Sequence, residues 1–127
     1  MRENGTDRDV ALAMLSTLTD INTAISTINN NLFNPIIITQ PSDVPDAVIG
    51  TTVSFSVVAV NVQTYQWQSR RSSTGGYTDS SLPGYNTDTL SPEVTSARFD
   101  IIYRCKMTSA QGNIVYTNEV RMYPPET

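Results

Sequence analysis

The chain has 127 residues, which is enough for one domain or for one small domain with an appendage. Its formal net charge of -4 excludes the basic surface that attracts nucleic acids or anionic membranes. Histidine is absent and Cys105 is the single cysteine, which excludes Ser-His-Asp or Cys-His catalysis, a disulfide within the chain and zinc sites rich in His or Cys. We therefore expect a protein that is not an enzyme and that holds no cofactor and no metal.

The N-terminal residues do not resemble a targeting segment. Residues 1–9 are polar, and no apolar run of the signal-peptide type follows them. Apolar stretches such as residues 36–38 are far too short to cross a bilayer. We expect a soluble product made in the cytoplasm, whose residues 1–9 form a polar anchor tied to another protein.

The composition changes abruptly near Asn34 and Pro35. All seven prolines and nine of the ten aromatic residues lie from this point onward. Such a change indicates a helix followed by an all-β domain. The predicted divisions are a polar anchor at 1–9, an amphipathic coiled-coil helix at 10–34 and a β-sandwich domain at 35–127.

The predicted helix carries an apolar stripe whose members recur at alternating spacings of four and three residues, as in a coiled coil. Its outer positions hold mostly Ser, Thr and Asn, which are poor helix formers, so the helix must gain stability by burying the stripe. Isoleucine at both heptad positions disfavours a parallel dimer and favours a homotrimer. Packing of the helix on its own β domain, or on another protein, stays open. The residues predicted to mediate oligomerisation are Met14, Leu18, Ile21, Ile25, Ile28 and Leu32.

The rest of the chain consists of short alternating runs separated by turn residues. Apolar and polar residues alternate over 52–59 and over 101–108, and a Gly75-Gly76 turn leads to Tyr77. About seven short strands in this length are typical of a two-sheet sandwich. The expected strands lie within residues 36–39, 52–59, 65–68, 87–91, 101–108 and 114–123, with one further strand after the glycine turn.

Three of these runs carry a resemblance to a known family. Residues 53–59, 65–68 and 103–108 resemble strands of an immunoglobulin-like domain of the kind found in bacterial surface proteins and tailed-bacteriophage virion proteins. The resemblance implies that Trp67 is the buried tryptophan of strand C and that Tyr103 stands at the tyrosine-corner position of strand F. It also implies that Trp67 packs against Val57 and a reduced Cys105, where many relatives have a disulfide.

Two segments depart from the immunoglobulin pattern. Residues 98–102 replace the small turn residue that usually precedes strand F, and the loop at 83–85 matches no family role.

The remaining candidate residues are the cysteine and several aromatic side chains. Cys105 alternates with Tyr103 and Met107, so we interpret it as a core residue and not as a reactive thiol. Trp67 and Tyr103 are interpreted as core anchors for the same positional reason. Aromatic side chains that face a ligand, such as a host-surface glycan, are better sought among Tyr77, Tyr85, Tyr116 and Tyr123.

These features together suggest a structural protein of a tailed bacteriophage: a head fibre, a capsid decoration or a collar or tail appendage. Its N-terminus would dock on other virion proteins, its helix would gather three chains, and its immunoglobulin-like domains would stabilise the shell or adhere weakly to the host. The expected location is the virion, assembled in the host cytoplasm. The alternative is an adhesion or interaction module of a bacterial surface protein. A monomeric binding domain is a third possibility.

Overall fold

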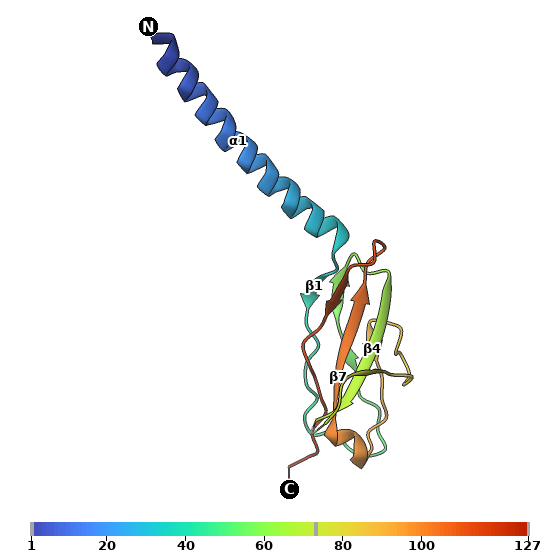
Figure 1. Ribbon diagram of the computed structural model, residues 1–127. Coiled ribbons are helices and arrows are strands. Elements are labelled where there is room, and N and C mark those ends of the chain that lie inside the picture. Colours follow the sequence, from blue (N-terminus) through green and yellow to red (C-terminus); the bar gives the residue numbers. More distant parts are fainter. Residues whose placement is uncertain (1, 73, 127) are drawn as a thin grey trace. The chain divides into compact units, whose positions relative to one another are not determined.

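The chain folds into two compact units, Met1–Leu32 and Phe33–Thr127. The computed structural model describes residues 2–72 and 74–126, and within the helix it describes the side chains of residues 13–28 and 33. One N-terminal α-helix precedes a series of short strands (Figure 1). The predicted fold class, mainly β with one N-terminal helix, is confirmed.

Helix α1 extends from Arg2 to Phe33 and is 32 residues long, or about 48 Å at 1.5 Å per residue. The sequence placed its start near residue 10, where the apolar spacing begins, and treated residues 1–9 as a separate anchor. The structure extends the helix back to Arg2, because this polar stretch contains no proline to break it. The helix ends before Pro35, since the residue preceding a proline is disfavoured in the α conformation.

Threonine side chains on α1 bond to the helix that carries them. Each hydroxyl donates to the carbonyl oxygen four residues earlier, over distances of 3.0–3.1 Å. Each bond pairs a threonine hydroxyl with a backbone carbonyl, so the polar group of a poor helix former has a partner on the helix itself. The donors are Thr17, Thr19, Thr23 and Thr27, and their acceptors are Ala13, Leu15, Thr19 and Thr23.

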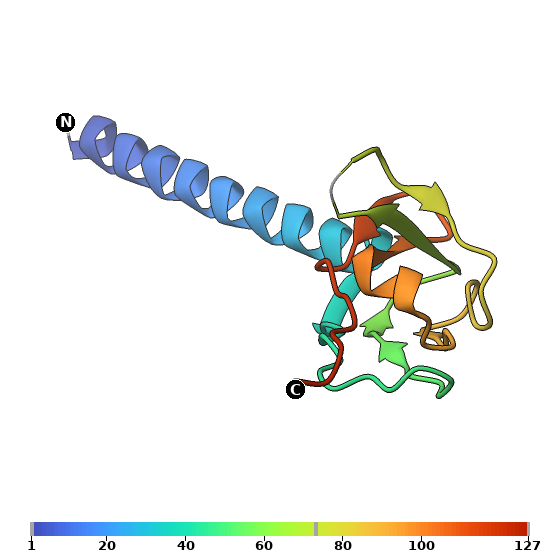
Figure 2. The same ribbon diagram turned by 90° about the horizontal axis from the view of Figure 1, so that it is seen from below.

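The second unit contains three small antiparallel sheets among its described residues, in the strand orders β1-β3, β2-β6 and β5-β4-β7-β8. The longest strands, β4 and β7, pair in register over eight residues, from Thr64 opposite Thr108 to Arg71 opposite Ile101. The two ribbon views show how the strands are arranged in this domain (Figures 1 and 2). The strands are β1 (Ile36–Thr39), β2 (Phe55–Ser56), β3 (Val58–Val60), β4 (Thr64–Arg71), β5 (Thr78–Asp79), β6 (Thr89–Leu90), β7 (Ile101–Thr108) and β8 (Ile114–Tyr116).

A single buried cluster forms the core of this domain. Alternate residues of β7 point into it, because side chains along a strand alternate between its two faces. The opposite layer contributes Phe55 and Leu90 from the paired strands β2 and β6. The rings of Phe55 and Tyr103 lie 5.4 Å apart between centroids, within the range of attractive aromatic pairs. Cluster members under 2% exposed are Phe55, Val57, Trp67, Leu90, Val94, Tyr103, Cys105, Met107 and Met122.

Three segments differ in detail from what the sequence suggested. The strand expected over 114–123 is shorter, because β8 ends at Tyr116. The expected run at 52–59 is interrupted at Val57, which separates β2 from β3 and whose N–H donates to the carbonyl oxygen of Asp88 at 3.0 Å. The unusual segment before β7 forms a short 3-10 helix, Ser96–Asp100, which makes the corner that a small residue usually makes.

The loop at 83–85, to which the sequence gave no role, closes over the core strand β4. Gly84 has a φ of +83°, and a Cβ at this position would lie 2.0 Å from the carbonyl oxygen of Thr89. The next residue, Tyr85, accepts the backbone N–H of Trp67 at 2.8 Å. The indole N–H of Trp67 donates to the carbonyl oxygen of Thr87, also at 2.8 Å. The loop and the nearby Thr87 therefore satisfy both N–H groups of the buried tryptophan, and the close approach of the loop to Thr89 requires glycine.

Candidate functional site

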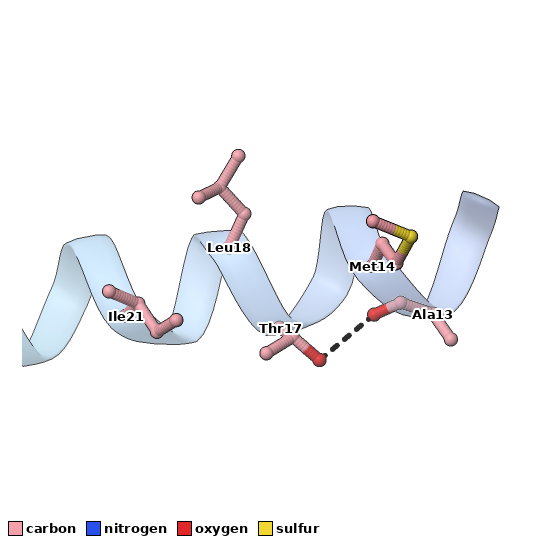
Figure 3. A pocket seen from close by; sticks show the side chains of 5 residues that line it. All are labelled: Ala13, Met14, Thr17, Leu18 and Ile21. Atoms are coloured by element: carbon pink, nitrogen blue, oxygen red, sulfur yellow. Dashed lines mark hydrogen bonds between the residues drawn. The ribbon is translucent and has the colours of Figure 1, made fainter. Parts of the chain in front are cut away.

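The apolar stripe of α1 is exposed along the described part of the helix. Five large apolar side chains in it are between 48% and 67% exposed. They are separated by four, three, four and three residues, so they share one face. A shallow hollow on this stretch is lined by Ala13, Met14, Thr17, Leu18 and Ile21 (Figure 3). The exposed residues are Met14, Leu18, Ile21, Ile25 and Ile28, and the side chain of Leu32, the sixth predicted member, lies outside the described residues.

The four predicted core residues of the sandwich lie in the buried cluster. Val57 and Tyr103 are each 1% exposed, and Trp67 and Cys105 are fully buried. Trp67 and Cys105 are direct cross-strand partners on β4 and β7. Burial raises the pKa of the Cys105 thiol to about 12, which keeps it protonated and unreactive at neutral pH.

The described residues contain no group of three or more His, Cys, Asp or Glu side chains that could hold a metal ion. Within that same part of the chain, no helix is long and apolar enough to cross a membrane.

The tyrosines singled out in the sequence lie in different places. Tyr77 and Tyr116 approach the same side chain, Arg104, from two sides. Tyr85 belongs to the loop over Trp67, and Tyr123 lies beside Arg121, whose guanidinium carbon is 5.2 Å from its ring centroid.

Arg104 lies between the rings of Tyr77 and Tyr116. Its guanidinium carbon is 3.9 Å from each of the two ring centroids, close enough for cation–π attraction to both rings. Its Nε donates to Oε1 of Gln68 at 2.9 Å, and Nε2 of Gln68 donates to Asp79 at 3.0 Å. We call Arg104, Tyr77, Tyr116 and Gln68 the arginine clamp.

A second group of polar contacts holds Tyr77 in place. The Tyr77 hydroxyl donates to Oε2 of Glu119, and the same oxygen accepts Nε and Nη2 of Arg70 at 3.3 and 3.1 Å. Hydrogen bonds from Tyr77 and then Arg70 lower the pKa of Glu119. Partial burial and then the bond to Glu119 raise the pKa of Tyr77 to about 12. The phenol and the carboxylate therefore stay bonded in these charge states across the neutral pH range.

The strand pairing explains how these side chains come together. Gln68 lies opposite Arg104 on β4 and β7, and Asp79 on β5 lies opposite Gln68. Tyr116 on β8 lies opposite Lys106, two residues from Arg104 on the same face of β7. The clamp therefore draws on β4, β7 and β8 and on Tyr77, which directly precedes β5, and it lies on the face directed away from the core.

Sequence reasoning did not identify Arg104, Arg70 or Glu119 as parts of a site. One available signal was the alternation of β7, which places Arg104 and Lys106 on the face opposite Tyr103 and Cys105. The partners of Arg104 come from separate segments, so their convergence on this side chain depends on the tertiary fold.

Comparison with known proteins identifies the fold. No protein-family model matches the chain, and no curated protein matches it significantly. Among solved structures, the structure of Sidekick-1 immunoglobulin domains 1–4 is similar over 72% of this chain and 24% of its own, with 19% identity and a TM-score of 0.51. A chimeric titin Z1Z2 tandem is similar over 75% of this chain and 51% of its own, with 21% identity and a TM-score of 0.48. This chain thus spans about a quarter of the first structure and half of the second, and it contains an immunoglobulin-like fold.

Proposed function

We propose that this chain is a non-enzymatic structural protein that self-associates through the stripe of α1 and displays an immunoglobulin-like domain from the assembly. The observation that carries the proposal is the exposure of the stripe: Met14, Leu18, Ile21, Ile25 and Ile28 are each about half exposed or more. A helix with such outer positions gains its stability by burying its apolar face. Three copies packing these faces together cover them, and isoleucine at both heptad positions favours that number.

The setting we propose for this assembly is a bacteriophage virion, as a head fibre, capsid decoration or collar or tail appendage. The support for this setting is the combination of a short coiled-coil stem with an immunoglobulin-like domain, which resembles such appendages. In this proposal the first residues of α1 dock on other virion proteins. The displayed domains then stabilise the shell or adhere weakly to the host surface. Labelling of purified bacteriophage particles with an antibody against this chain tests whether the chain belongs to a virion. This test does not depend on whether the chain forms a trimer.

The proposal that the protein is non-enzymatic is supported by its chemistry. The chain has no histidine, and its one thiol is buried with a raised pKa. The polar groups gathered on the sheet surface are an arginine held by aromatic rings and an ion pair, an arrangement that suits binding.

The assembly is tested by the solution mass of the full chain, measured by light scattering after size exclusion. We expect a mass near three times 14.0 kDa for the wild type. The double variant Leu18→Asn with Ile25→Asn places two amides in the stripe and should reduce the mass to that of one chain. Ser16→Asn with Thr23→Asn has the same seven-residue spacing on the opposite side of the helix and should leave the trimer intact. A wild-type monomer at tens of micromolar would refute the proposed assembly.

A further inference from the structure

The outer face of the sheet β5-β4-β7-β8 carries cationic side chains on a protein that is acidic overall. Arg70, Arg104 and Lys106 lie on this face, since they alternate with the inward residues of β4 and β7. Two carboxylates lie beside them and already have partners: Glu119 bonds Arg70 and Tyr77, and Asp79 accepts from Gln68. Arg104 helps to lower the pKa of Glu119 through its charge, but no carboxylate among the described residues forms an ion pair with it.

The guanidinium of Arg104 is fixed in position and has donors to spare. Its guanidinium carbon lies 3.9 Å from the ring centroids of two tyrosines, and its Nε donates to Gln68. The four N–H donors of its two Nη atoms have no hydrogen-bond acceptor among the described residues, so they remain for a ligand. A carboxylate matches this pair of nitrogens, because its two oxygens can accept from both Nη atoms at once.

The clamp is also organised before any ligand arrives. Tyr77 is held through its hydroxyl by Glu119, and Gln68 is held by Asp79. Because these side chains are already ordered, a ligand does not have to immobilise them, and less of its binding free energy is lost.

The exposed part of the Tyr116 ring indicates which kind of molecule would bear the carboxylate. Tyr116 remains 44% exposed although Arg104 stacks on it, so part of its ring is free at the edge of the guanidinium. Ile114, two residues earlier on the same face of β8, is 46% exposed. A pyranose ring has apolar C–H groups that pack on such a surface.

We propose that the arginine clamp binds the carboxylate of an acidic sugar, with Arg104 as the carboxylate partner and Tyr116 as the stacking surface. This inference deepens the proposed function, since it gives the displayed domain a ligand class. It needs only one folded domain and does not depend on the trimer.

The test is calorimetric titration of the full-length protein with oligogalacturonate, with its methyl ester as a probe that lacks the charge. We expect the acid to bind and the ester to bind at least about tenfold more weakly, since it has lost a charge-assisted pair of hydrogen bonds. Arg104→Lys keeps the positive charge but loses the planar guanidinium with its paired N–H donors. It should therefore weaken binding of oligogalacturonate about tenfold. Arg71→Lys, at an exposed arginine at the end of β4, is the matched control and should bind as the wild type does.

A second pair of variants tests the stacking surface. Tyr116→Leu should weaken binding, whereas Tyr123→Leu, at an equally exposed tyrosine outside the clamp, should not. Thermal melting followed by circular dichroism checks that each variant is folded.

Four results would overturn the proposal: no binding of oligogalacturonate, equal binding of its ester, wild-type affinity in Arg104→Lys, or tighter binding of polyglutamate than of the sugar acid. The variant Leu18→Asn with Ile25→Asn separates this inference from the assembly. It should keep the affinity of each single domain even when the trimer is lost, so one proposal can fail while the other stands.

Discussion

The helix and the immunoglobulin-like domain differ in how far they bury their apolar side chains. The described apolar side chains of the α1 stripe are about half exposed or more, whereas the apolar residues of the domain core are almost fully buried. The domain covers its core with residues of the same chain, so we expect it to fold without further copies. The helix leaves its stripe uncovered, and in the proposed assembly further copies of the chain cover it. If the helix assembles as proposed, domain stability and assembly depend on separate parts of this chain and can be altered separately.

The same kind of truncation should have different consequences in the two regions. Trp67→Ala removes a fully buried indole, together with its bond to Thr87, and should destabilise the domain by about 3–5 kcal/mol. Ile25→Ala removes an exposed side chain from the helix, so it should leave domain stability unchanged within about 0.5 kcal/mol while weakening self-association. Denaturant unfolding followed by tryptophan fluorescence measures the effect of Ile25→Ala, and unfolding followed by circular dichroism measures that of Trp67→Ala.

This comparison fails if Ile25→Ala lowers domain stability as much as Trp67→Ala does. That result would mean that the two units stabilise each other. A dilution series adds an independent check: helicity should fall with dilution, whereas the tryptophan signal should not.

Two glycines allow a finer comparison within the domain. Gly84 and Gly112 both have positive φ angles, +83° and +87°, but only at Gly84 does an added Cβ meet another atom within 4 Å, the backbone around Thr89. Gly84→Ala should therefore combine backbone strain with a clash and cost about 3–5 kcal/mol. Gly112→Ala introduces backbone strain without a clash and should lower the free energy of unfolding by about 1–2 kcal/mol.

Chemical denaturation of the two glycine variants measures this difference directly. Equal losses of stability would show that the loop at 83–85 is free to move away from β6. Its role in holding Trp67 would then be minor.

The sequence was informative where structure depends on neighbouring residues. The alternation of Tyr103, Cys105 and Met107 correctly predicted the strand at 101–108, because a period of two is visible within one strand. The position of Trp67 within the pattern correctly indicated an immunoglobulin-like fold. The apolar spacing correctly indicated a helix, yet it placed the start too late, because polar residues before the stripe carry no periodic signal.

The sequence was uninformative where distant segments meet. Arg104 gave no signal of a site by itself, since an arginine on the outer face of a strand is ordinary. Its partners Tyr77 and Tyr116 precede β5 and end β8, and only the order of strands in the sheet brings them to its two sides. The interruption at Val57 has the same origin, since its N–H bonds to Asp88, 31 residues later in the chain.

The smallest expected effect on domain stability comes from the contacts of Glu119 with Tyr77 and Arg70 beside the clamp. These side chains are partly exposed, unlike those of the buried core. The pKa of Glu119 is lowered in the folded chain, so its bonds stabilise the fold above the ordinary carboxyl pKa of 4.5. This contribution is lost as the pH falls through the lowered value. Since the side chain of Glu119 is 52% exposed, solvent screening limits the contribution to less than about 1 kcal/mol.

Glu119→Gln should therefore destabilise the domain slightly at pH 7 and by a smaller amount near pH 3, where the wild-type carboxyl is becoming protonated. Tyr77 gives the matching measurement at high pH, because its pKa is raised to about 12 against an ordinary value of 10.0. Stability that depends on the neutral phenol is complete below pH 10 and is lost as the pH rises toward 12. Phenolate absorbance of the wild type minus that of Tyr77→Phe isolates this titration. A difference curve centred at pH 10 would show that Tyr77 does not bond Glu119 in solution, and the clamp would then lack its support on that side.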